Sequence, residues 1–395
     1  MQYFKYKLKL NQSERIILSQ WIGSNRCLYN LALSQRQMID HKELKSRGEM
    51  PVNYNYQAAE LKALKQEFEW FKDVPGQTLQ QTLMQLDGAF KRFWNGLASF
   101  PQFKKKSQDM GIKIPKGNTK KNPIGNFHFP EHPNPQKGYI KLPKVGTPFR
   151  FHKHRDMEGE VKAVTVRKEG CDFYISVLCN IGDKYDHVEH QNSNVIGIDR
   201  GIAKSLAYSD GNFSELPKTR IKSLEARIAS LQVALARKIK FSKSWRKLRN
   251  RISKLHKRIT RIRHDFLWKT AHNLSKNHAV VVLEALKTSN MSRSAKGSLE
   301  EPGKNVAAKS GLNRAILREG WYMFSQMLEW ECKKHGSRVV YVNPRNTSLT
   351  CSSCGKAEKS SRKDQARFEC SCGFSANADT NAAINIKNLA AACSG

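Results

Sequence analysis

The sequence predicts a multidomain protein of the α+β class, on three observations. Short apolar runs rich in β-branched residues, bounded by turn residues, indicate buried strands. Other segments repeat apolar residues at spacings of three and four, as helices do. A length of 395 residues allows for two to four domains. No run of about 18 apolar residues occurs, so we expect no membrane span.

The N-terminal part is expected to hold one strand and a small group of helices. Residues 1–10 alternate apolar and basic side chains, as in a strand, and lack the apolar run of a signal peptide. Asn11 and Glu14 have the spacing of a capping box, which predicts the start of a helix. Further helices are predicted over roughly 55–70 and after Pro75.

Residues 99–190 are expected to leave this helical pattern. Residues 99–117 mix prolines, aromatic residues and a lysine run. This segment is either a solvated linker or, as we favour, a basic strand and loop lining a nucleic-acid channel, with Phe100 and Phe103 to stack or anchor it. Its candidate nucleic-acid contacts are Lys104, Lys105 and Lys106. From 124 to 190, about five short runs separated by turn residues predict a β-barrel.

The second half is expected to form a mixed sheet with helices on its faces. Two strands are predicted to end at Asp199 and Glu284. A short strand and its turn are predicted after Asp199, and a further strand is predicted at 338–344. Helices are predicted between these strands, around Trp321, and from Asp379 onward. An RNase H-like core meets this description.

Two long antiparallel helices are predicted to pack as a coiled-coil hairpin over residues 216–265. Apolar residues recur at spacings of three and four across 221–235 and again across 245–262. The stretch 237–263 carries 13 Lys and Arg residues and no acid. Such a run is either a solvated helix face or a nucleic-acid contact, and its density favours the contact. The candidate contact residues are Arg246, Arg249, Arg251, Lys254 and Arg258.

The charge of the whole chain points to a polyanionic partner. Lys and Arg number 69 against 34 Asp and Glu, which gives a net charge of +35. This excess predicts many phosphate contacts and salt-sensitive binding to nucleic acid. A ribosome-like or membrane-surface protein is the alternative, but the length and the apolar strands favour a structured enzyme core.

Three acidic residues stand where a metal-dependent site could form. Asp199 and Glu284 each close an apolar β-branched run, and Asp379 opens an Ala-rich segment as a natural first-turn residue. Carboxylates from adjacent strand ends and one helix can converge and bind Mg²⁺ or Mn²⁺ through oxygen ligands. Two such ions about 4 Å apart would clamp the attacking and leaving oxygens of a phosphodiester.

Four of the nine cysteines predict a zinc ribbon over residues 345–375. Cys351 and Cys354 form a C-x₂-C pair, Cys370 and Cys372 form a shorter C-x-C pair, and a glycine follows each. Four thiolates at this spacing indicate one structural, tetrahedral Zn²⁺. The other five cysteines are scattered along the chain, which indicates a protein of the reducing cytoplasm rather than a disulfide framework. These other cysteines are Cys27, Cys171, Cys179, Cys332 and Cys393.

The chain resembles the TnpB (OrfB) family of insertion-sequence proteins, which are relatives of the type V CRISPR effectors. The resemblance spans essentially the full length and is specific in the C-terminal half. The matching segments are PQFKKK (101–106), GIDRGI (197–202), VVLEAL (281–286), SGLNRAILREGWYMF (310–324), VNPRNTSLTCSSCG (342–355) and CGFSANADTNAAINI (372–386).

The resemblance implies an RNA-guided DNA endonuclease with a single RuvC-like site. Asp199, Glu284 and Asp379 match the catalytic trio of the family, which would hold two Mg²⁺ or Mn²⁺ ions for in-line attack of water. The partners would be a guide RNA encoded near the gene and double-stranded target DNA with a short flanking motif. We expect a prokaryotic, nucleoid-associated protein of the cytoplasm with no membrane partner.

The resemblance also divides the chain into domains. Residues 1–10 and 107–190 would form a wedge-like β-barrel, 11–106 a helical recognition domain, and 191–395 a RuvC-like nuclease core. The hairpin and the zinc ribbon would belong to this core. Asn377 and Ala378 depart from relatives, which often carry another acid and an arginine before the third acid.

Three alternatives to a guided nuclease are open. A non-cleaving, RNA-guided repressor would be expected to have lost catalytic acids, and all three are present. An unguided, structure-selective RuvC nuclease would need neither the N-terminal half nor a strongly cationic hairpin. A DNA-strand transferase would show a transesterification site, such as a tyrosine beside paired histidines, and the sequence shows none.

Overall fold

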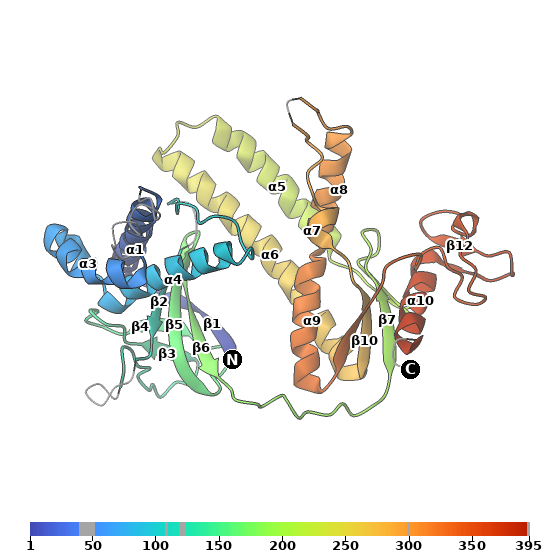
Figure 1. The fold of residues 1–395 in the computed structure, drawn as a ribbon, viewed down its shortest axis with the longest axis horizontal. Helices are drawn as coiled ribbons and strands as arrows, with labels where there is room; N and C mark the ends of the chain where they lie inside the picture. The colour runs from blue at the N-terminus through green and yellow to red at the C-terminus, as the bar shows by residue number, and fades with distance from the viewer. Residues whose placement is uncertain (39–51, 107–109, 118–123, 299, 393–395) are drawn as a thin grey trace, which may run out of the picture. The chain divides into compact units, whose positions relative to one another are not determined.

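The computed structural model describes residues 1–38, 52–106, 110–117, 124–298 and 300–392, so Cys393 lies outside the described residues. The chain divides into two compact units, Met1–Gly182 and Asp183–Gly395. Each unit combines helices with a sheet, which confirms the predicted α+β class (Figure 1). The finer domain boundaries at residues 10, 106 and 190 stay predictions.

The first unit begins as the pattern of its N-terminal residues predicts. Strand β1, Gln2–Lys9, buries alternate side chains. Helix α1, Gln12–Met38, starts at the predicted capping box. Oδ1 of Asn11 accepts from the backbone N–H of Glu14 at 2.9 Å, and the Glu14 carboxylate accepts from the N–H of Asn11 at 2.8 Å. This reciprocal pair satisfies donors that the start of a helix leaves without partners.

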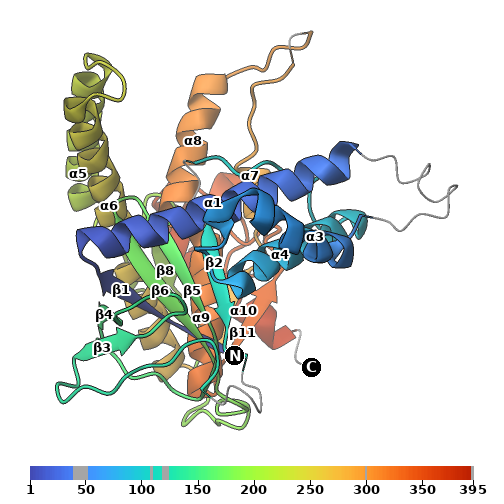
Figure 2. The ribbon, with the colours of Figure 1, turned by 90° about the vertical axis from the view of Figure 1, so that its left-hand side faces the viewer.

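Further helices follow in the described residues of this unit. They are α3 (Tyr54–Glu67), a 3₁₀ turn η1 (Glu69–Phe71) and α4 (Gly76–Trp94). Their apolar faces share one core with the strands, centred on large buried side chains such as Trp21, Phe71 and Phe149. Figure 2 shows α1 lying across strands of the sheet, and both α1 and α4 contact β2.

The sheet of the first unit has six strands in the order β2-β5-β6-β1-β4-β3, with antiparallel neighbours throughout. Its other strands are β2 (Gly111–Pro115), β3 (Lys137–Ile140), β4 (Phe149–His152), β5 (Glu160–Glu169) and β6 (Asp172–Asn180). Among the short runs predicted between 124 and 190, the one around His128 forms only an isolated bridge to Lys141. The wedge-like barrel stays a prediction, since β2 and β3 are the edges of this sheet.

The second unit is built on a mixed sheet of five strands in the order β11-β10-β7-β8-β9. The parallel strands are β7 (Val195–Asp199), β10 (Val280–Glu284) and β11 (Arg338–Val342). The antiparallel strands are β8 (Leu206–Tyr208) and β9 (Phe213–Ser214). A mixed sheet is what the order of elements in the sequence predicts.

Side chains along the central strands point alternately to the two faces of the sheet, so the core of this unit forms two layers. Ile198 and Leu283 pack with helices α6 (Lys243–Asn277) and α9 (Trp321–His335) on one face. Val282 packs with Ile386 of α10 (Ala378–Ala392) on the other face. Figure 1 shows α10 on one side of β7, with α6 and α9 on the opposite side.

The predicted hairpin is formed by α5 (Lys218–Ala236) and α6, but its second helix is longer than predicted. The prediction ends at 265, whereas α6 continues to Asn277. The reason is a change of partner. Ile252 and Ile259 pack against α5, while Leu267 and Leu274 join the core of the sheet. One continuous helix therefore connects the cationic hairpin to the sheet.

The remaining elements frame the C-terminal part of this unit. Between β10 and α9 lie α7 (Thr288–Met291) and α8 (Val306–Glu319). Between β11 and α10 lie η2 (Lys359–Ser361), β12 (Arg367–Glu369) and β13 (Ser375–Asn377), and the two strands form a small antiparallel pair. Across the residues that the structure describes, no helix is long and apolar enough to cross a membrane.

Candidate functional site

The structure brings Asp199, Glu284 and Asp379 to one pocket. Asp199 ends β7 and Glu284 ends β10, and these strands pair in parallel with Leu283 opposite Ile198. Asp379 lies in the first turn of α10. All three acids line an open pocket of about 310 Å³. The predicted convergence of two strand ends and one helix start is therefore observed.

A glycine in β7 allows α10 to approach the acids. Gly197 lies two residues before Asp199 and so on the same face of the sheet. A Cβ at this position would lie 2.2 Å from the carbonyl oxygen of Ala383 and 2.6 Å from the backbone nitrogen of Lys387, both on α10. The missing side chain thus permits the close contact that carries Asp379 to the strand ends.

The three carboxyl groups are poorly solvated and repel one another. Burial, followed by the charges of Glu284 and Asp379, raises the pKa of Asp199 to about 7. Burial also raises the pKa of Glu284, against a 2.6 Å hydrogen bond from the Thr347 hydroxyl that lowers it. A divalent cation would relieve both effects, because it would replace the proton as the neutralising charge.

Asp379 is positioned by the turn that begins α10. Oδ1 of Asn377 accepts from the N–H of Asp379 at 3.0 Å and from the N–H of Thr380 at 3.3 Å. Asn377 therefore caps this helix. Arg362 lies 3.4 Å from Oδ1 of Asp379, and its charge partly offsets the burial that raises the pKa of this acid.

Sequence reasoning did not predict the roles of Arg200, Thr347 and Arg362, which also line the pocket. Arg200 is buried, and its guanidinium donates to the hydroxyl of Ser325 at 2.9 Å and to the backbone carbonyl of Glu284. Because Arg200 directly follows Asp199 in the sequence, its presence at the site could have been predicted. Neither Thr347 nor Arg362 follows a periodic pattern, and both meet the acids only through the tertiary fold.

The oxygen donors of this pocket fit hard divalent cations. Within the described residues, two groups place all their ligand atoms within 4.8 Å of one another: the four cysteines and a His–Glu group on α6 and α9. The three acids are not among those two groups.

The four predicted zinc ligands lie together. The Sγ atoms of Cys351 and Cys372 are 3.8 Å apart, and those of Cys354 and Cys370 are 3.6 Å apart. Thiolates bound to zinc at about 2.3 Å in a tetrahedral site lie about 3.8 Å apart, so the cluster fits this ion despite its C-x-C pair.

Helix α10 connects the cysteine segment to the acidic pocket. The buried Asn385 donates to the carbonyl oxygens of Thr347 at 2.9 Å and Thr350 at 2.6 Å. The buried Asn381 donates to Thr350 at 2.8 Å and accepts from the N–H of Ser352 at 2.9 Å. A displacement of the cysteine segment would therefore be transmitted to the helix that carries the third acid.

The predicted lysine run is attached to the helices of the first unit. Phe100 packs edge-on against Phe90 of α4, with ring centroids 5.5 Å apart. The backbone N–H of Lys104 donates to the side chain of Asn30 on α1 at 2.7 Å. Phe100 therefore anchors this segment, which was one of its two predicted roles. The exposed side chains of the run are those of Lys105 and Lys106.

The hairpin exposes all five of its predicted contact residues, which are Arg246, Arg249, Arg251, Lys254 and Arg258. Within the part of the chain that the structure describes, none of the five forms an ion pair with a carboxylate. Beneath them, the apolar residues of α5 and α6 form a separate core. These charges are consequently available to phosphate groups.

Neutralising two of these residues, Arg249→Gln with Arg251→Gln, should weaken nucleic-acid binding and its dependence on salt. Each lost phosphate contact on duplex DNA should reduce the log–log salt slope by about 0.9, or about 1.8 for the pair. Binding titrations over a range of salt concentrations measure this slope. Lys269→Gln, on the same helix, is the control because Asp265 already pairs with Lys269 at 2.9 Å. An unchanged slope in the double variant would show that this face of the helix is solvated and does not contact nucleic acid.

Comparisons with known sequences match most of the chain. The family described as "Probable transposase" (OrfB of IS605) matches residues 176–295, and "Cas12f1-like, TNB domain" matches 321–386. A family described as "Helix-turn-helix domain" matches residues 1–42. In the described part of that last segment, the structure has strand β1 and one helix, α1.

Two curated relatives match over nearly their whole length. "Putative RNA-guided DNA endonuclease InsQ" from Escherichia coli strain K12 is 37% identical over 389 residues, covering 98% of this chain and 91% of the relative. "Putative RNA-guided DNA endonuclease" from Streptomyces pristinaespiralis is 28% identical over 393 residues, covering 97% and 88%.

Solved structures of Cas12 proteins share the fold. The Cas12f1–sgRNA–target DNA complex matches with a TM-score of 0.58 at 16% identity, over 96% of this chain and 83% of that one. The mini-RNA-guided endonuclease CRISPR-Cas_phi3 matches with a TM-score of 0.50 at 11% identity, over 98% and 92%.

The fold and the sequence matches together define a transposon-associated protein with the α+β architecture of Cas12 effectors. Within that class, the near full-length match to the Escherichia coli relative, at 37% identity, shows the family. The chain belongs to the TnpB (OrfB) family of insertion-sequence proteins.

Proposed function

We propose that this protein is an RNA-guided, metal-dependent DNA endonuclease that cuts both strands of its target through one RuvC-like site. The observation that carries the proposal is the convergence of Asp199, Glu284 and Asp379 at two parallel strand ends and one helix start. The names of the E. coli relative and of the solved Cas12f1 complex support guide RNA and DNA as partners.

In this proposal the acids hold two Mg²⁺ or Mn²⁺ ions, which when bound would supply a nucleophilic hydroxide and stabilise the leaving oxygen of a phosphodiester. All three acids would hold the ions, and the charge of Asp199 is coupled to those of both Glu284 and Asp379. Thr347 would orient Glu284 through its 2.6 Å hydrogen bond. Arg200 would act as a positioning residue, since it holds the backbone at the end of β10.

We further propose a domain plan for the chain. Residues 1–10 and 107–190 form the wedge-like barrel, 11–106 the recognition domain and 191–395 the RuvC-like core. One structural Zn²⁺, bound by the four clustered cysteines, orders the segment beside α10. The exposed cations of α6 and the lysine run contact nucleic-acid phosphates, while the guide RNA reads the target by base pairing.

The purified protein should carry RNA encoded beside its gene, and removal of this RNA should abolish cleavage of matched DNA. Adding back the RNA should restore cleavage in Mg²⁺, and a DNA without a match to the guide is the control. Full activity after complete removal of RNA would identify an unguided nuclease. Guided binding without cleavage in Mg²⁺ would identify a repressor.

A further inference from the structure

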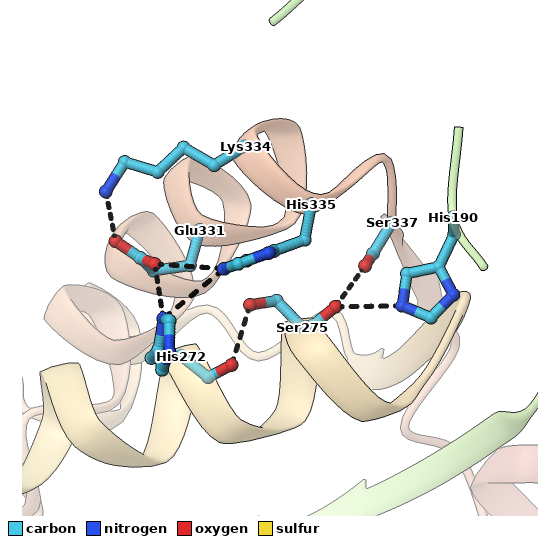
Figure 3. Close-up of polar contacts among 7 residues, drawn as sticks. All are labelled: His190, His272, Ser275, Glu331, Lys334, His335 and Ser337. Atoms are coloured by element: carbon cyan, nitrogen blue, oxygen red, sulfur yellow. Dashed lines mark hydrogen bonds and ion pairs between the residues drawn. The ribbon is translucent and has the colours of Figure 1, made fainter. Parts of the chain in front are cut away.

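Three metal-ligating side chains gather on the face of the second-unit sheet opposite to α10. His272 lies on α6, while Glu331 and His335 lie four residues apart on α9 and so share one face of that helix. Figure 3 shows the three side chains pointing toward one another from the two packed helices. The acidic pocket and the cysteines involve none of these residues.

Their ligand atoms are spaced as the corners of a single coordination sphere. Nδ1 of His272 lies 3.2 Å from Oε2 of Glu331 and 3.3 Å from Nε2 of His335. Nε2 of His335 lies 3.8 Å from the same carboxylate oxygen. In a tetrahedral zinc site with bonds of about 2.0–2.1 Å, two such ligand atoms lie about 3.3–3.4 Å apart. The separations of 3.2 and 3.3 Å match this value, and the third, at 3.8 Å, is about 0.4 Å longer, so a small side-chain adjustment brings the three atoms onto one face of a tetrahedron.

A cation explains this arrangement better than hydrogen bonds alone. Two imidazole nitrogens face each other and the same carboxylate oxygen, so one proton between them cannot satisfy all three atoms. The Glu331 side chain is only 6% exposed, and Lys334 balances its charge through Oε1, so Oε2 is the atom that faces the two imidazole rings.

The side chains around His272, Glu331 and His335 leave their ligand atoms accessible to an ion. Nζ of Lys334 bonds Oε1 of Glu331 at 2.7 Å, which leaves Oε2 free to act as a ligand and orients the carboxylate. His190 is no fourth ligand, because both of its ring nitrogens lie 3.1 Å from backbone carbonyl oxygens, those of Asn192 and Ser275. An open pocket of about 540 Å³ borders His272 and Glu331 and offers an entry path.

We propose that His272, Glu331 and His335 bind a divalent transition-metal ion, foremost Zn²⁺, through Nδ1, Oε2 and Nε2, with a fourth position open to solvent. Two imidazoles and one carboxylate favour zinc over Mg²⁺, which prefers oxygen ligands throughout. The bound ion would cross-link α6 to α9. Since α6 also carries the cationic hairpin, the ion would fix the base of that hairpin against the sheet.

The test is zinc binding by the full-length chain in excess Mg²⁺, which occupies the acidic pocket. Wild type should bind two equivalents of Zn²⁺, and His272→Asn should bind one fewer, or bind the second at least about 100-fold more weakly. His272 is half exposed, with 51% of its side chain accessible, so this variant should fold. His256→Asn is the matched control, because His256 is an exposed histidine on the same helix.

A ribbon variant separates the two zinc sites. Cys354→Ser should lose the cysteine-bound equivalent and retain the one that depends on His272, and added Zn²⁺ should still raise its Tm. The double variant should lose both equivalents. The proposal is overturned if His272→Asn binds as much zinc as wild type with the same affinity. It is equally overturned if Cys354→Ser binds no zinc at all.

Discussion

Asp199→Asn, Glu284→Gln and Asp379→Asn should each abolish cleavage of both DNA strands. Each change removes a ligand charge from a shared two-metal cluster while keeping the size of the side chain. We expect a loss of at least about 10³-fold in cleavage rate, equivalent to about 4 kcal/mol of transition-state stabilisation. Double variants should lose little more than single ones, because the three acids act as a unit. Nicking and double-strand cleavage assays on plasmid DNA measure both strands.

Guided binding to target DNA should survive these changes. Binding depends on base pairing and on cations elsewhere, and each variant removes a negative charge near the phosphates. Gel shifts on the same preparations separate binding from cleavage. Asp210→Asn is the matched control, because Asp210 is an exposed acid that bonds Asn212 in the turn after β8. If Asp199→Asn still cut one strand at the wild-type rate, a second nuclease site would have to exist.

Gly197→Ala should inactivate the protein without removing any polar group. Its Cβ would lie 2.2 Å and 2.6 Å from backbone atoms of α10, which cannot yield as a flexible side chain can. The helix must shift, and Asp379 shifts with it. A displacement of about 1 Å at a catalytic group can reduce the rate about 10²-fold, which is the loss we expect.

Cleavage assays at several Mg²⁺ concentrations, with thermal unfolding of the same samples, test this expectation. A higher Mg²⁺ requirement in a folded protein would show that the acids have moved apart. Gly311→Ala on α8 is the control, because a Cβ there meets no atom within 4 Å and alanine favours a helix. Wild-type cleavage by Gly197→Ala would mean that the packing of α10 on β7 does not position the third acid.

The hairpin illustrates a limit of sequence periodicity. Apolar spacing correctly predicts two paired helices, but it places the end of the second helix at 265 rather than at Asn277. A helical repeat shows which face of a helix is buried and not what covers that face. Leu267 and Leu274 continue the repeat of Ile252 and Ile259, yet they pack against a different layer of the protein.

The candidate site shows the same division between local and tertiary information. Asp199, Glu284 and Asp379 are recognisable because each lies at the end of a strand or the start of a helix, and these positions are local properties of the chain. Arg362 and Thr347 lie in irregular segments without a periodic pattern. Their contacts with the acids depend on how the cysteine segment folds back against α10.

The α+β class, the three acids, the clustered cysteines and the cationic helix can all be recognised in the amino-acid sequence. Alternation, helical spacing and ligand spacing are properties of short segments, so they can be identified without knowledge of the fold. The close approach of α10 to Gly197 and the contact of His272 with Glu331 and His335 become visible only in the folded protein. Such contacts join residues far apart in sequence, and their distances depend on helix packing and strand register, which no short segment specifies.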